Sequence, residues 1–272
     1  MRTFCFSTAL CSLLFACGTV EQADLGGDDP GGKGDKGDES SPDAGVEPTY
    51  EGRVALITHT NAQASNPQTF VQASFGQGAL GLGPVLAEAG GCSLTAFADP
   101  QAAMPAGDLE VTGGSQPITM PFFLGAYNFM AEQAVFSVGS TLTVSAPGDV
   151  VPAFTANVDV PPRLGAVPIP SSISRSAGTT LTWTPGGAST AFISIVFKSS
   201  GDLRLLRCLT TDSGSFEISA QALALVPANV QSAQIAVAHY NEVIVKPNPS
   251  WSIAIQAGDL DVPAPTIISI VP

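Results

Sequence analysis

Short apolar runs, each closed by glycine or proline, are the feature that most restricts the fold of this chain. From residue 50 onward, apolar residues alternate with polar ones or stand in brief blocks. The 272 residues include 28 glycines and 22 prolines, while charged residues make up only 12%. Because turn formers between short alternating runs are typical of strands joined by tight turns, the sequence predicts an all-β protein.

The predicted strands fall into two groups, separated by Pro161 and Pro162, which cannot donate to a strand ladder. We therefore predict two tandem β-sandwich domains, residues 50–162 and 163–272. About seven strands in about 100 residues make the second domain immunoglobulin- or fibronectin-like. The predicted strands are Arg53–Ile57, Thr69–Phe75, Ser93–Phe97, Leu109–Thr112, Ile118–Met120, Ala134–Val138, Leu142–Ser145 and Ala153–Val158, then Thr179–Thr184, Ala191–Lys198, Leu203–Leu209, Ser215–Ile218, Ala233–His239, Val243–Val245 and Ser250–Gln256. Between the last groups, Ser219 is expected to cap a single helical turn that Pro227 stops.

The first residues have the layout of an export signal. Residues 1–16 carry one positive charge and an apolar stretch too short to span a bilayer as a helix. Leu14-Phe15-Ala16-Cys17 resembles the lipobox of bacterial lipoproteins, and this resemblance implies a lipid on Cys17 as the first residue of the mature protein. Residues 17–49 are rich in glycine and aspartate, and we predict a disordered tether there.

The whole arrangement resembles uncharacterised lipoproteins of myxobacteria, which join a lipobox, an acidic glycine-rich tether and a paired β-sandwich region. Besides the lipobox, three strings carry this resemblance: residues 106–114 (AGDLEVTGG), 152–156 (PAFTA) and 181–187 (LTWTPGG), the last followed by Cys208 and by residues 212–216 (DSGSF). The family brings no known activity. It implies attachment to the cell envelope, and Gly18 after the lipidated residue favours the outer membrane over the inner.

Charge and composition restrict the partners. A net charge of −13, with no basic cluster, argues against nucleic acid. His59 and His239 stand apart from other ligands at metal-binding spacing, so we expect neither a metal nor another cofactor. The partners that we expect are the membrane, through the lipid anchor, and a carbohydrate or an envelope protein.

Two cysteines remain after removal of the signal, Cys92 and Cys208. In an oxidising compartment they could form a disulfide that joins the two predicted domains. The alternative, which we favour slightly, is two buried thiols in separate cores.

The Asp212-Ser213-Gly214 segment is similar to the sequence around the nucleophile of chymotrypsin-like proteases, with His59 available as a base. The flanking residues of that family are absent. We therefore predict a hairpin turn, and no enzymatic activity.

Exposed aromatic side chains commonly stack on sugars, and we identify Phe122, Phe123 and Tyr127 as candidates for a surface site. Trp251, by contrast, alternates with apolar residues and should lie in a core. The expected function is that of a lipid-anchored envelope protein that binds or displays. The alternatives are an envelope hydrolase with an interdomain site and a subunit of an envelope assembly.

Overall fold

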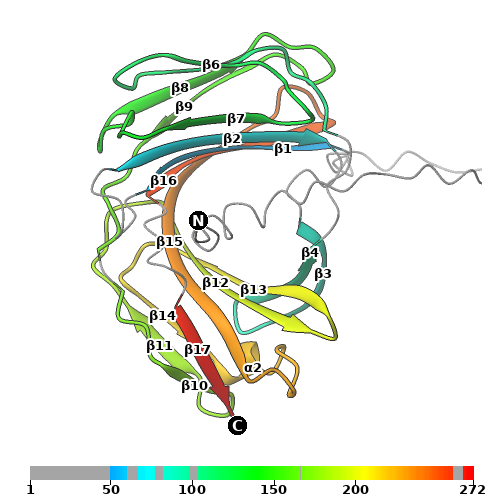
Figure 1. Cartoon of the computed structure of the whole chain (residues 1–272), viewed down its shortest axis with the longest axis vertical. Helices are drawn as coiled ribbons and strands as arrows, with labels where there is room; N and C mark the ends of the chain where they lie inside the picture. Colours follow the sequence, from blue (N-terminus) through cyan, green and yellow to red (C-terminus); the bar gives the residue numbers. More distant parts are fainter. Residues whose placement is uncertain (1–49, 60–66, 77–81, 98–102, 166, 260–265) are drawn as a thin grey trace, which may run out of the picture.

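The computed structural model describes residues 50–59, 67–76, 82–97, 103–165, 167–259 and 266–272. One long, strongly curved sheet forms the body of the molecule, and smaller layers of strands lie on its outer side (Figure 1). This confirms the predicted all-β, sandwich-like fold. Within the described residues, no helix is long and apolar enough to cross a membrane.

The curved sheet has the strand order β3-β4-β13-β12-β15-β16-β1-β2-β7, and β17 also pairs with β15 and with β10. Neighbouring strands are antiparallel except for two pairs, β1 with β16 and β10 with β17. The strands are β1 (Tyr50–His59), β2 (Gln68–Gly76), β3 (Leu82–Ala89), β4 (Cys92–Phe97), β7 (Tyr127–Ala131), β10 (Ser172–Ser174), β12 (Thr190–Ser199), β13 (Asp202–Thr210), β15 (Ser232–Val245), β16 (Trp251–Asp259) and β17 (Thr266–Val271).

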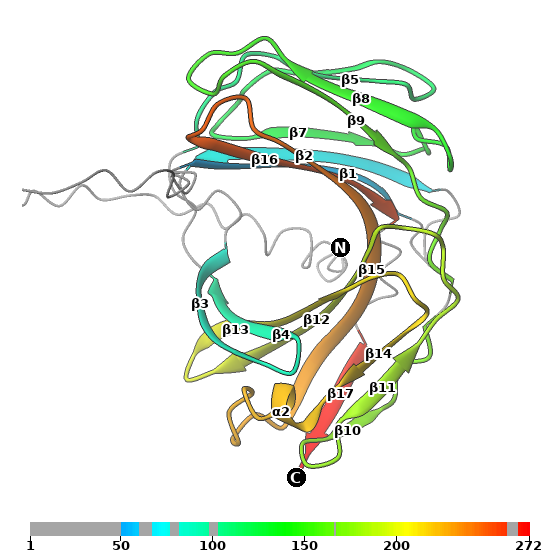
Figure 2. The same ribbon diagram turned by 180° about the vertical axis from the view of Figure 1, so that it is seen from behind.

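Two smaller sheets complete the layers. The first has the order β6-β5-β8-β9 and lies against the end of the curved sheet formed by β16, β1, β2 and β7 (Figure 2). The second pairs β11 with β14 near the other end. Their strands are β5 (Leu109–Thr112), β6 (Ile118–Met120), β8 (Thr141–Ala146), β9 (Phe154–Asp159), β11 (Thr179–Thr182) and β14 (Ser215–Ile218).

Both hydrophobic cores lie on the same face of the curved sheet. Strand residues alternate between two faces, and the residues that point outward along β1, β16, β12 and β13 are almost all apolar and buried. The first core contains Val54, Leu56, Ile253 and Ile255, and the second contains Ile193 together with other residues of β12, β13 and β15. The smaller sheets cover these two patches, so each end of the curved sheet is one half of a sandwich.

Each core draws strands from both sides of residue 162. Cys92 and Leu94, from the first half of the chain, belong to the second core, where β4 pairs with β13. Trp251, from the second half, belongs to the first core, where β16 pairs with β1. The curved sheet is continuous between the two sandwiches, and a domain boundary at residue 162 stays a prediction.

Most predicted strands are present, and two of the predictions differ from the structure. The sequence indicated two strands, Ala233–His239 and Val243–Val245, where the structure has the single 14-residue strand β15. The predicted strand Ala134–Val138 is wrong, because Val135 and Phe136 are buried without belonging to a strand. The predicted helical turn is confirmed as α2 (Ala220–Leu223), capped by Ser219.

Candidate functional site

The inner face of the curved sheet, opposite the two cores, carries a group of polar side chains. The alternation that sends Val54 and Leu206 to the cores sends Arg53 of β1 and Arg207 of β13 to this inner face. Between them lie Gln256 of β16 and Tyr240 and Glu242 of β15. We call Arg53, Arg207, Tyr240, Glu242 and Gln256 the inner polar cluster.

A chain of hydrogen bonds links three strands within this cluster. Arg53 Nε donates to Gln256 Oε1 at 2.8 Å, and Gln256 Nε2 donates to Glu242 Oε2 at 2.5 Å. Gln256 lies directly opposite Glu242 in the antiparallel register, which explains their contact. The amide thus orients both a cation and an anion.

The charges of the cluster act on one another. Burial lowers the pKa of the Arg53 guanidinium, Glu242 opposes this shift, and the nearby Arg207 adds to it. Burial also raises the pKa of the Tyr240 hydroxyl, and Glu242 adds to that rise, while both arginines oppose it. Two guanidinium groups therefore share this face with one carboxylate, Glu242, whose charge favours the charged form of Arg53.

Arg207 borders a pocket on the same face. The pocket has a volume of about 430 Å³ and lies at the turn between β3 and β4. Arg207 Nε is buried and has no hydrogen-bond partner. Leaving a buried donor unpaired is costly, so this atom is suited to receive an acceptor from a ligand. The pocket is lined by Arg207, Leu209, Ser93 and residues 88–92.

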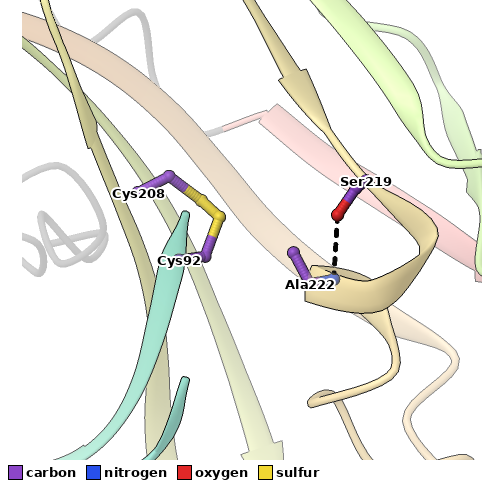
Figure 3. The surroundings of a disulfide bond; sticks show 4 residues. All are labelled: Cys92, Cys208, Ser219 and Ala222. Atoms are coloured by element: carbon purple, nitrogen blue, oxygen red, sulfur yellow. Dashed lines mark hydrogen bonds between the residues drawn. A yellow bond between two sulfur atoms is a disulfide. The ribbon is translucent and has the colours of Figure 1, made fainter. Parts of the chain in front are cut away.

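A disulfide joins Cys92 of β4 to Cys208 of β13 beside this pocket (Figure 3). The two residues face each other directly in the ladder, with Cα atoms 4.2 Å apart. The preference for two separate thiols is therefore wrong, because β4 lies in the same sheet as β13 and not in another domain. The bond fixes the β3–β4 hairpin, whose turn residue Gly90 leaves no room for a Cβ against Ser219.

The Asp212 carboxylate lies in the interior near the second core. It accepts hydrogen bonds from Trp183 Nε1 at 2.6 Å, from the backbone N–H of Gly186 at 2.7 Å and from that of Ala188 at 3.2 Å. His239 Nδ1 is 3.3 Å away, and both side chains are buried. Burial alone would raise the pKa of Asp212, but these hydrogen bonds outweigh it and hold the pKa below its ordinary value.

The Asp212-Ser213-Gly214 segment forms a turn, as predicted, but not a hairpin. It connects β13 of the curved sheet to β14, which pairs with β11 in another sheet. Gly214 has a positive φ of 88°. Ser213 Oγ donates to the carbonyl of Ser215, so its hydroxyl is engaged within the turn. The side chain of His59, the proposed base, lies outside the described part of the structure.

The three candidate aromatics differ in exposure. Tyr127 is fully buried, and its hydroxyl accepts from Ala106 N at 2.7 Å and donates to Gly107 O at 2.8 Å, so its predicted surface role is wrong. Phe122 is half-buried against Tyr127. Phe123 is 70% exposed, next to the 86% exposed Leu124.

The expected lack of a metal and the lipidation of Cys17 stay predictions. No group of three or more metal-binding side chains occurs among the described residues. Cys17 lies outside them. Sequence reasoning missed Arg53 and Arg207, although strict alternation along Arg53-Val54 and Leu206-Arg207 could have separated them from the core face.

No protein-family model and no curated protein matches the chain. Among solved structures, it aligns with a structure described as giving insight into host cell surface retention of a 1.5-MDa bacterial ice-binding adhesin. The alignment covers 79% of this chain and 66% of the adhesin chain, with 12% identity and a TM-score of 0.22. A similarity this low carries no argument about function.

Proposed function

We propose that this chain is a lipid-anchored binding module of the bacterial cell envelope, held in the outer membrane through Cys17. Its inner polar cluster is the contact surface for a carbohydrate. The lipobox and the glycine-rich residues 17–49 support the anchor and the tether. The cluster supports the binding role, because polar groups gather on the one face of the curved sheet that no core occupies.

The observation that carries the binding role is the chain of hydrogen bonds from Arg53 through Gln256 to Glu242. Donors and acceptors that are oriented before binding lose little entropy when a ligand arrives. A cation, an amide and a carboxylate in one row match the donors and acceptors of a hydroxyl-rich ligand. Tyr240 adds an aromatic ring beside them.

Palmitate labelling of cells tests the anchor. The unaltered protein should take up the label and fractionate with the outer membrane, and Cys17→Ala should do neither. Cys11→Ala, which removes a thiol ahead of the lipobox, should keep both properties. An unlabelled wild-type protein, or a labelled Cys17→Ala protein, contradicts the anchor.

A panel of immobilised polysaccharides tests the binding surface. The wild-type protein should retain at least one polymer, and Gln256→Ala should weaken that retention about tenfold, because it breaks the chain of hydrogen bonds from Arg53 to Glu242. Glu217→Gln, an exposed position on β14, serves as the control and should bind like wild type. Equal binding by all three proteins would place the ligand elsewhere.

The second candidate function is that of a subunit in an envelope assembly. It is favoured by β3, an end strand of the curved sheet, in which Val85 and Leu86 are about half exposed. A photo-crosslinking amino acid at position 86 should give a discrete envelope product if this strand is covered in the cell. Failure to form any such product argues for the first candidate.

A further inference from the structure

We infer that the ligand of the inner face is an acidic polysaccharide whose carboxylates are held by Arg207 and Arg53. This inference rests on the proposed function and specifies its ligand. It begins from the charge balance of the face: the chain has a net charge of −13 and only ten Lys and Arg, yet two arginines converge here. A local positive charge in an acidic protein attracts anions selectively.

The convergence of the arginines is itself unfavourable without a ligand. Arg53 is half-buried, and the charge of Arg207 acts against its own. Glu242 offsets part of this repulsion, but its carboxylate already accepts from Gln256. Among the described residues, no carboxylate forms a salt bridge with either guanidinium. A bound carboxylate would offset both the repulsion between the two arginines and the cost of removing the Arg53 guanidinium from water.

Arg207 determines which chemical group of a ligand this face should bind. Its Nε is buried without a partner, and it borders the pocket that Ser93 also lines. The planar guanidinium donates two parallel hydrogen bonds to a carboxylate, a geometry that a neutral hydroxyl cannot reproduce. The Ser93 hydroxyl can serve a sugar hydroxyl beside the carboxylate.

The spacing of the cluster favours a polymer over a single small acid. Arg207 and Arg53 lie on β13 and β1, with β12, β15 and β16 between them. Four strand steps correspond to roughly 19 Å along the sheet. The sheet curves so that its inner face is concave (Figure 2), and the charge of Arg207 helps to lower the pKa of Arg53 on this face. An extended chain of acidic sugars can contact this face at several points.

Polygalacturonate and its fully methyl-esterified form test the inference, because they share a backbone and differ in charge. Binding is measured with the full-length lipidated protein in detergent, in low and in high salt. We expect the acidic polymer to bind at least about tenfold more tightly than the ester, with an affinity that falls as salt rises.

Arg207→Met should reduce binding of polygalacturonate about tenfold or more and leave the weak binding of the ester unchanged. Arg204→Met is the matched control: it removes the same charge from the same strand, but at a position paired with Asp202. It should bind within twofold of wild type. Near-UV circular dichroism establishes whether each variant is folded. If Arg207→Met does not fold, the salt titration of the unaltered protein with the two polymers tests the acidic ligand instead.

The results distinguish failure of the acidic ligand from failure of the proposed binding function. Equal affinity for both polymers, with Gln256→Ala still impaired, overturns the acidic ligand and leaves the binding module intact. Equal losses in Arg204→Met and Arg207→Met overturn the role of the inner face. If the protein binds neither polymer, the inference is wrong. The palmitate experiment tests the lipid anchor independently of any ligand.

Discussion

Asp212 shows at the residue scale how a charge is held in the interior. Its carboxylate receives an indole N–H and two backbone N–H groups, from Trp183, Gly186 and Ala188. The acceptor therefore organises the loop after β11 as well as the Trp183 ring. The sequence suggested a turn at this position, but the donors come from a segment about 25 residues earlier, which local pattern does not reveal.

Asp212→Asn should lower the free energy of unfolding by about 2–4 kcal/mol at pH 7, because the amide presents its own N–H to donors. The pKa of the folded state lies below 3.8, so the contribution of the carboxylate is complete above that pH and is lost as the pH falls through the folded value. Urea unfolding at pH 7, 5 and 3 should show the gap between the two proteins narrowing at the acid end. Asp202→Asn, at an exposed position, should unfold like wild type throughout.

Leu124 is an apolar residue in a conformation that suits glycine or asparagine. Its φ is +49°, and the N–H and C=O groups of Phe123 and Ala126 bond across the two-residue turn. Leu124→Asn should raise the free energy of unfolding by about 0.5–1 kcal/mol. Leu124→Ala removes the same exposed side chain but keeps the strain, and should give no gain. A matching gain in both variants would assign the effect to exposure.

Among the strands, β3 is one that the sequence did not predict. Its partner β4 was predicted within one residue at its start, because apolar residues alternate with Ser93 and Thr95 along Cys92–Phe97. β3 contains Gly83 and Pro84 and pairs through register shifts, so its sequence lacks clear alternation. For β15 the error was the opposite, because one strand was predicted as two. Tyr240, Asn241 and Glu242 look like a polar break in the sequence. In the structure they contact other side chains and backbone groups where the strand passes between the cores.

The β3–β4 hairpin depends on its disulfide. Among the described strands, β13 is the one that pairs this hairpin with the rest of the curved sheet, and Cys92 and Cys208 are 116 residues apart in sequence. Replacing both with alanine should lower the free energy of unfolding by about 5 kcal/mol in the chain-entropy estimate. Hydrogen exchange should rise more in residues 82–97 than in β8 and β9, where it increases only through global unfolding. Equal exchange in the hairpin before and after the replacement would contradict this dependence.

At the scale of the molecule, one sheet serves two cores. The sequence correctly indicated sandwich layers, because alternation is a local property of each strand. It did not indicate the parallel pairing of β1 with β16 or the place of β4 beside β13. Such pairings depend on register between segments about 100–200 residues apart, and no local pattern specifies it.

The shared sheet should make the two sandwiches unfold together. Ile193→Val in the second core and Ile253→Val in the first remove one methyl group each from fully buried positions. Each should cost about 1 kcal/mol and lower the midpoint of a single calorimetric transition by a few degrees. Two transitions, of which each variant shifts only one, would instead support independent domains.

The position of β1 has a mechanical consequence. Tyr50 opens a strand that lies between β16 and β2, inside the sheet and not at its edge. In a chain tethered as we propose, drag on a bound polymer pulls on the N-terminal end of β1, and the component of this force along the strand acts on both of its ladders. The hydrogen bonds that join β1 to β16 and to β2 are then loaded in shear. They share the force and do not break one after another. Because β1 is paired on both sides, it should resist such a pull better than an edge strand would.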